Sequence, residues 1–179
     1  ETFLRRQSAG QPFFLYFPLT APHDPWVPSP DFRGRSQAGD YGDFVSQVDA
    51  TVGRVLAVLE EQGLARNTIV MVTSDNGSHW PPSDLERWEH RANGLWRGMK
   101  SDVWEGGHRV PFWVRWPARV KPGTPSDTLI CLTDVLATMA ELAGIRIPAG
   151  AAEDSISFAR ALRGDRGPRK QLIMHSING

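Results

Sequence analysis

The chain lacks several features that would decide its class at once. It has a single cysteine, Cys131, which excludes an internal disulfide framework. No apolar run approaches the roughly 20 residues that a membrane-spanning helix needs, so we expect no membrane span. The 20 basic and 20 acidic side chains cancel, and this balance gives no reason to expect a nucleic-acid partner. These absences favour a globular protein with room for one hydrophobic core.

The chain also begins at Glu1 without an initiator methionine, and no signal peptide pattern is visible. We therefore expect a processed product or an incomplete sequence. Tryptophan and proline, in contrast, are abundant, with 7 and 14 residues. At this length they favour long, structured loops around a pocket over a helical bundle.

Hydrophobic patterning predicts alternating strands and helices. Apolar residues recur every three or four positions from Tyr41 to Leu59, which predicts a helix that Gly39 or Asp40 begins and Gly63 ends. Short apolar runs predict buried strands, as in a parallel sheet. The other predicted elements are a helical tail at 1–9, strands at 13–17, 69–73, 110–116 and 172–175, and helices at 132–143 and 155–162. Strand, helix and strand over 13–73 predict a βαβ unit, and the alternation predicts an α/β fold with a mostly parallel sheet flanked by helices.

Polar side chains follow two of these predicted strands. His23 comes shortly after the strand at 13–17, and Asp75 and Asn76 come directly after the strand at 69–73. Open α/β sheets bind their ligands at the edge where such strands end, and the oxygens of Asp75 and Asn76 suit a hard cation such as Ca²⁺ or Mg²⁺. The simpler alternative is that Asp75-Asn76-Gly77 is only a turn and that His23 is a surface residue.

Two glycine-containing segments come later, Gly98-Met99-Lys100 and Glu105-Gly106-Gly107-His108-Arg109. Beside the bound cation and His23, Lys100 would contribute a fixed positive charge to the same site. Together these groups would suit an oxyanion such as a sulfate or phosphate ester. We interpret Arg109 as a structural partner for a loop carboxylate such as Glu105.

In order and spacing, these motifs resemble the sulfatase family of the alkaline-phosphatase-like superfamily. The resemblance is carried by Pro12-Phe13-Phe14-Leu15-Tyr16, Ala21-Pro22-His23, Val48-Asp49 with Val52-Gly53, Thr73-Ser74-Asp75-Asn76-Gly77, Gly98-Met99-Lys100, residues 105–111, residues 133–144 and His175-Ser176. It covers nearly the whole chain. It implies that residues 1–179 are a single partial sulfatase catalytic domain, with an alkaline-phosphatase-like fold that is incomplete in this chain.

The resemblance also implies roles for single residues. Asp75 and Asn76 would be metal ligands for a divalent cation, usually Ca²⁺, with Mg²⁺ as the alternative. His23 would bind the sulfate and protonate or position the leaving oxygen, and Lys100 would contact the sulfate oxygens. The substrate would be a small-molecule or carbohydrate sulfate ester, and the compartment periplasmic, secreted or lysosomal. The resemblance implies no oligomeric state.

The sequence departs from the family at the nucleophile. Sulfatases use a formylglycine made from the first residue of a Cys/Ser-x-Pro/Ala-x-Arg motif. Cys131 lacks the proline or alanine and the arginine that this motif requires, and in Ser157-Phe158-Ala159-Arg160 the arginine comes one residue too early. We therefore expect the formylglycine and the remaining metal ligands upstream of Glu1, and we expect this chain alone to be inactive.

Two other functions stay open at this point. One is a phosphodiesterase or phosphonate-ester hydrolase of the same superfamily, and the other is a nucleophile-free relative that acts as a binding or scaffold module. The loops at 24–39 and 78–97 would either line a specificity pocket for an aryl or carbohydrate sulfate or pack as ordinary loop cores. Their residues of interest are Trp26, Trp80, Trp88, Arg91 and Trp96.

Overall fold

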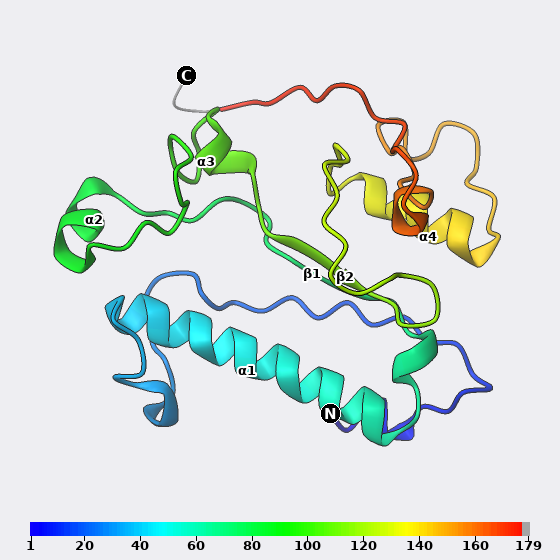
Figure 1. Cartoon of the computed structure of the whole chain (residues 1–179), viewed down its shortest axis with the longest axis horizontal. Coiled ribbons are helices and arrows are strands. Elements are labelled where there is room, and N and C mark those ends of the chain that lie inside the picture. Colours follow the sequence, from blue (N-terminus) through cyan, green and yellow to red (C-terminus); the bar gives the residue numbers. More distant parts are fainter. Residues whose placement is uncertain (177–179) are drawn as a thin grey trace.

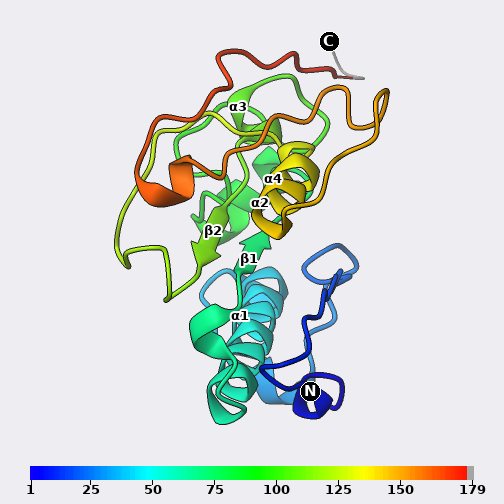
Figure 2. The same ribbon diagram turned by 90° about the vertical axis from the view of Figure 1, so that its right-hand side faces the viewer.

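A two-stranded sheet lies between one long helix on one side and a shorter helix on the other (Figures 1 and 2). The computed structural model describes residues 1–176. The elements in chain order are η1 (Leu4–Arg6), η2 (Pro30–Phe32), α1 (Gly39–Glu61), η3 (Ala65–Asn67), β1 (Val70–Thr73), α2 (Pro82–Trp88), α3 (Glu105–His108), β2 (Phe112–Arg115), α4 (Asp134–Ala143) and η4 (Ala161–Arg163). Long irregular loops connect them, as the proline content predicts.

The long helix α1 forms where the periodicity predicts it. Near its start the buried carboxylate of Asp43 accepts hydrogen bonds from the backbone N–H groups of Gly34 and Ser36, at 2.6 and 2.7 Å, which fixes the preceding loop. The helix ends before Gly63, whose φ of +66° lies in the left-handed region. Glycine adopts this conformation without the steric cost of a Cβ, so the predicted stop residue is confirmed.

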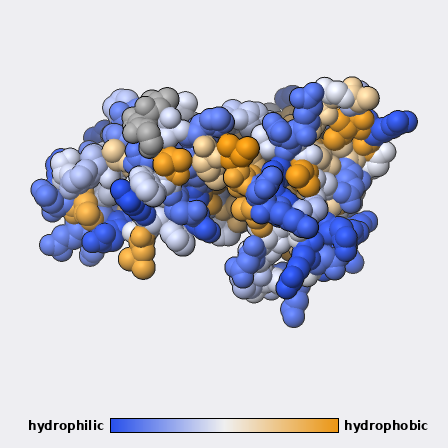
Figure 3. Space-filling model, turned by 90° about the horizontal axis from the view of Figure 1, so that it is seen from above, coloured by the Kyte–Doolittle hydropathy of each residue, from blue (hydrophilic) through white to orange (hydrophobic). Residues whose placement is uncertain are grey.

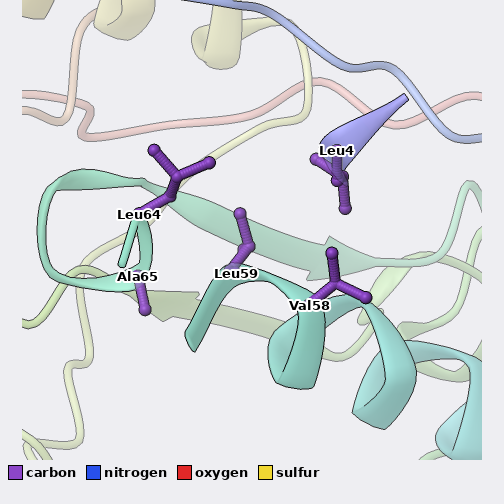
Figure 4. Close-up of a cluster of buried hydrophobic side chains, with 5 residues drawn as sticks. All are labelled: Leu4, Val58, Leu59, Leu64 and Ala65. Atoms are coloured by element: carbon purple, nitrogen blue, oxygen red, sulfur yellow. The ribbon is translucent and has the colours of Figure 1, made fainter. Parts of the chain in front are cut away.

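A small hydrophobic core lies at the C-terminal end of α1. It consists of five buried side chains, Leu4, Val58, Leu59, Leu64 and Ala65. Figure 4 shows these side chains, which come from η1, from the end of α1 and from the turn after it. Phe13 and Val70 pack against this core, which thereby ties the N-terminal segment to the start of β1.

The strands β1 and β2 pair antiparallel, with Val70 opposite Arg115 and Thr73 opposite Phe112. Both strands lie within the ranges that the apolar runs predict, 69–73 and 110–116. The polypeptide between them is long and contains α2 and α3, so the connection imposes no parallel crossover. The end of β1 and the start of β2 therefore lie together, near the predicted site residues.

The predicted strand at 13–17 is wrong for this structure, and with it the predicted βαβ unit. Within residues 1–176 this segment belongs to no sheet. Phe14 and Tyr16 on one side are 78% and 77% exposed, and Leu15 and Phe17 on the other are 41% and 54% exposed. Only Phe13 packs against the core, so most of the segment is uncovered on both sides. The apolar run indicates side chains that are stabilised by burial. A strand also needs a neighbouring strand that satisfies its backbone hydrogen bonds.

The helix α4 is held by its first residue, Asp134, which is fully buried. Its carboxylate accepts hydrogen bonds from the backbone N–H groups of Cys131 and Ile156 and from the Arg169 guanidinium. Burial alone would raise the pKa of Asp134, but the hydrogen bonds from Arg169 and from the two backbone groups together hold it below its usual value. Asp134 thus joins three segments of the chain.

The predicted helix at 155–162 is reduced to the short 3₁₀ turn η4. The backbone before that turn instead donates hydrogen bonds to side chains of α4. Ile156 N–H donates to Asp134 and Phe158 N–H donates to the Thr138 hydroxyl, at 2.8 and 3.0 Å. These contacts hold the segment outside any helix, and no local sequence pattern reveals them.

The two ends of the chain also differ from the prediction. The helical tail expected at 1–9 is only the turn η1. Residues 172–175, predicted as a strand, are irregular, and Ile173 is exposed; any continuation of the predicted strand past Ser176 lies outside the described residues. Within residues 1–176 no helix is both long and apolar enough to cross a membrane.

Candidate active site

His23 and Lys100 are in contact although they lie far apart in the sequence. His23 Nε2 and Lys100 Nζ are 3.0 Å apart. A lysine ammonium can only donate hydrogen bonds, so His23 Nε2 is the acceptor in this arrangement. The other ring nitrogen, Nδ1, then carries the hydrogen and donates to the backbone oxygen of Asp24 at 2.7 Å. The structure thus brings together both residues that the sequence predicts as catalytic.

The Lys100 loop is fastened to the polypeptide that follows β1. Lys100 N–H donates to the backbone oxygen of Ser78, two residues after Asn76, at 3.2 Å. The Asn93 side chain accepts a hydrogen bond from Ser78 N–H at 2.8 Å and donates to the Ser78 oxygen at 2.9 Å. It also donates to the Gly98 oxygen at 3.3 Å. Asn93 therefore clamps the loop that carries Lys100 onto the loop that carries Asn76.

Backbone segments approach each other very closely at Gly77 and at α3. Gly77 N–H donates to the Gly107 oxygen at 2.9 Å. A Cβ placed on Gly77 would overlap the carbonyl oxygen of Gly106, and a Cβ on Gly106 would overlap that of Gly98. The Glu-Gly-Gly motif therefore forms one helical turn. Because its glycines have no side chain, three loops can approach one another there.

Asp75 and Asn76 lie just past the end of β1, as predicted. Asp75 is exposed, and its carboxylate forms no hydrogen bond or ion pair with any residue from 1 to 176. The Asn76 amide nitrogen donates to the Gly77 oxygen at 3.3 Å, which leaves its side-chain oxygen available. In donor chemistry the two oxygens fit Ca²⁺ or Mg²⁺.

Two oxygens are too few for a complete metal site. Ca²⁺ takes about 6–8 oxygen ligands, and among the described residues no group of three or more His, Cys, Asp or Glu could hold a metal ion. Further ligands would have to join Asp75 and Asn76. Their assignment as metal ligands stays a prediction.

The ion pair predicted beside the site is confirmed. Arg109 Nε lies 2.5 Å from Glu105 Oε2, both half exposed on α3 and its C-terminal end. The Arg109 guanidinium also lies over the Trp96 ring, 4.3 Å from its centre. Arg109 therefore has a structural role here, holding the loop before Lys100 against α3.

Aromatic side chains from both long loops pack behind Lys100. The Tyr41 ring lies 4.6 Å from that of Trp80 and 5.4 Å from that of Trp26. Trp80 also donates from Nε1 to the His90 oxygen at 2.7 Å, and Ser78 Oγ lies 3.1 Å from the Tyr41 hydroxyl. Trp26 and Trp80 thus form a loop core, one of the two predicted alternatives.

Sequence reasoning missed three residues that organise this site, namely Tyr41, Ser78 and Asn93. Asn93 precedes Gly94 in a polar loop and has the pattern of an ordinary turn residue. Tyr41 has the pattern of a residue on the apolar face of α1. Their contacts with Ser78 join positions far apart in the sequence, which no spacing rule reveals.

Comparisons with known proteins agree with this arrangement. The family model Sulfatase matches residues 1–145. The chain is 44% identical to the steryl-sulfatase of Mus musculus, over 98% of this chain and 28% of that protein. It is 37% identical to the N-acetylgalactosamine-6-O-sulfatase of Bacteroides thetaiotaomicron, over 94% of this chain and 34% of that protein.

Solved structures show the same relationship. One, described with the metabolism of multiple glycosaminoglycans by Bacteroides thetaiotaomicron, superposes with a TM-score of 0.84 at 37% identity, covering 94% of this chain and 35% of that chain. A sulfatase from Pseudoalteromonas sp. gives a TM-score of 0.68 at 31% identity, covering 83% of this chain and 29% of that one. The chain thus spans about a third of each relative's length. Its fold is a part of the α/β alkaline-phosphatase-like fold. The chain belongs to the sulfatase family.

Proposed function

We propose that the intact protein containing this chain hydrolyses sulfate esters. The observation that carries the proposal is the 3.0 Å contact between His23 Nε2 and Lys100 Nζ, beside the end of β1 in a chain of the sulfatase family. The contact places a fixed cation and a proton-carrying group at one point. A sulfate ester needs both, because charge builds up on its oxygens and on the leaving oxygen as the bond breaks.

In this proposal Lys100 donates hydrogen bonds to the sulfate oxygens and offsets the charge on the leaving oxygen. His23 donates a proton from Nε2 to the leaving oxygen after it has taken one up. The hydrogen bond between His23 Nδ1 and the Asp24 oxygen keeps the ring oriented for that transfer. Ser78 and Asn93 hold Lys100 in position.

We propose Asp75 and Asn76 as ligands of a divalent cation, Ca²⁺ with Mg²⁺ as the alternative. The exposed, unpaired Asp75 carboxylate supports this assignment. When bound, such a cation withdraws charge from the sulfate oxygens. We propose that the other ligands and a formylglycine nucleophile come from residues of the intact protein beyond the 179 of this chain.

We propose a sulfated carbohydrate as substrate and a periplasmic, secreted or lysosomal compartment. Several relatives are N-acetylgalactosamine-6-sulfatases, and one structural neighbour was solved with D-glucosamine-2-N,6-O-disulfate. The 44% identity to a steryl-sulfatase keeps a steryl sulfate as the second candidate.

The test is release of inorganic sulfate by the intact protein from aryl, sugar and steryl sulfates. We expect Lys100→Ala to lower kcat about 100-fold or more, while Lys121→Ala, an exposed lysine outside the site, keeps wild-type rates. A chelator should abolish activity and Ca²⁺ should restore it, and the isolated 179-residue chain should be inactive.

Other outcomes would select one of the alternatives. Cleavage of phosphodiesters without release of sulfate would replace the proposal with the phosphodiesterase alternative. Binding of sulfate esters without turnover by the intact protein would favour the scaffold alternative. Wild-type activity in Lys100→Ala would show that Lys100 has no catalytic role.

A further inference from the structure

A cavity of about 530 Å³ lies where the C-terminal end of α2 meets the start of α1. Figure 1 shows α2 above this end of α1, and the Trp88 ring closes against Gly39. The cavity volume falls within the range of about 300–1,000 Å³ that is typical of small-ligand sites. Its walls combine apolar and aromatic surface with hydrogen-bonding groups. The lining residues include Gln37, Tyr41, Val45, Trp88, Glu89 and His90.

The cavity shares one wall with the candidate active site. Tyr41 lines the cavity, and its hydroxyl bonds to Ser78, whose backbone oxygen accepts the hydrogen bond from Lys100. On the other side Tyr41 packs on Trp26, three residues after His23. Tyr41 therefore links the wall of the cavity to both loops that carry the proposed catalytic residues.

The charges of the walls decide which part of a substrate would fit. Among the described residues, no lysine or arginine lines the cavity, although the Arg87 guanidinium lies 4.6 Å from the centre of the Trp88 ring. Glu89 adds an acidic group to the lining and His90 adds an imidazole. The lining residues therefore offer a sulfate group no lysine or arginine as a direct partner. A sterol is also a poor fit, because it would cover Gln37, Ser46 and Glu89 without offering them hydrogen bonds.

A neutral sugar ring fits better, because it has an apolar C–H face for an aromatic wall and hydroxyl groups around its edge. We propose that this cavity holds the neutral sugar next to the sulfated one, so that Trp88 and Tyr41 select for an oligosaccharide. This inference rests on the proposed function and deepens it. It makes the cavity wall a specificity determinant separate from the sulfate-binding residues.

The experiment uses the intact protein and three probes: 6-O-sulfated N-acetylgalactosamine, a disaccharide that carries this sulfated sugar, and the same disaccharide without sulfate. Val45→Trp fills the cavity from an exposed helical position. Gln37→Ala removes one polar group from an exposed loop position. Glu86→Trp is the matched control, because Glu86 is exposed on α2 and does not line the cavity.

We expect Val45→Trp to weaken binding of the unsulfated disaccharide about tenfold. It should also raise the KM of the sulfated disaccharide, relative to that of the sulfated monosaccharide, by a similar factor. Gln37→Ala should weaken binding of the unsulfated disaccharide about threefold, the loss of one neutral hydrogen bond. Glu86→Trp should match the wild type in every measurement.

Unchanged disaccharide binding in Val45→Trp would overturn the inference. So would binding of the unsulfated disaccharide with no change in the KM ratio, because the cavity would then hold a glycan unrelated to the substrate. An effect of Val45→Trp on steryl sulfate hydrolysis alone would also overturn it. If no sulfate ester is hydrolysed, the proposed function fails, yet binding of the unsulfated disaccharide still shows whether the cavity holds a sugar.

Discussion

At the scale of single residues, the close approach at Gly77 and Gly106 gives a sharp prediction. We expect Gly77→Ala and Gly106→Ala in the intact protein each to lower the free energy of unfolding by about 1–3 kcal/mol or more, because the added Cβ overlaps backbone oxygen that cannot move aside. Urea denaturation measures the change. Activity should fall in parallel, since the same backbone positions the Lys100 loop.

Gly53→Ala is the matched control. Gly53 lies inside α1 with nothing within 4 Å of an added Cβ, and alanine in a helix interior is favoured over glycine by about 1 kcal/mol. We expect this variant to be slightly more stable than the wild type. Equal effects of all three substitutions would show that the close approach does not constrain the fold.

Part of the site could be predicted from residue types and order. His23 and Lys100 come from different loops, yet they meet at 3.0 Å, because both loops return to the same end of β1. The clamp at Asn93 could not be predicted. Its side chain works through hydrogen bonds to Ser78, 15 positions earlier, and such pairs depend on the path of the loops.

At the scale of elements, the buried Asp134 makes the anchoring of α4 dependent on pH. Its pKa in the folded protein lies below the ordinary value, which is about 3.9 for an aspartate. The stabilisation is therefore fully present above pH of about 4 and is lost as the pH falls through the lower, folded value. We expect urea midpoints of the intact protein to fall over this acid range.

Variants separate this contribution from those of other carboxylates. Arg169→Met should destabilise the protein by about 3–5 kcal/mol at neutral pH, because it leaves a buried carboxylate without its cation. Asp134→Asn should flatten the acid dependence of the urea midpoint. An unchanged acid profile in Asp134→Asn would show that other groups control it.

The elements that could be predicted are those whose own residues decide them. The periodic face of α1, its stop at Gly63 and the end of the predicted helix at 132–143 are local features, and they are confirmed. The helix α4 ends at Ala143, before Gly144 with its φ of +67°. The run at 13–17 and the segment before η4 depend on partners elsewhere. The hydrophobicity of residues 13–17 indicates that their side chains favour burial. Whether they form a strand depends on a neighbouring segment that pairs with their backbone.

At the scale of the whole molecule, the exposed surface is large for the mass. The chain exposes 12,827 Å², whereas a folded monomer of 19.9 kDa is expected to expose about 8,700 Å². Figure 3 shows separate apolar patches among polar ones on the face seen from above. Phe14, Tyr16 and Trp113 are among the large exposed side chains.

We therefore expect the isolated 179-residue chain to bind a hydrophobic dye and to aggregate, because unpaired extended backbone and apolar surface both favour association. Dye fluorescence and light scattering measure this, with the intact protein as the control. A cooperative thermal transition with low dye binding would contradict the prediction.

The clamp at Asn93 also affects how the protein ages. An asparagine before a glycine deamidates when the next backbone nitrogen attacks its side-chain carbonyl. Here that nitrogen, on Gly94, is bonded to the Arg91 oxygen at 2.8 Å, and the Asn93 amide is held on both sides. We therefore expect peptide mapping to find aspartate at this position only after time spent unfolded, and not after native storage.

Each such event replaces the Asn93 amide donor with an oxygen that faces the backbone oxygens of Ser78 and Gly98, and these groups repel one another. Molecules that refold after this change should have lost the placement of Lys100, so aspartate at position 93 should rise in step with irreversible loss of activity. Equal deamidation in native and heated samples would contradict this. If aspartate at position 93 does appear only in samples that have unfolded, Asn93 acts as a chemical clock for the time that each molecule has spent unfolded.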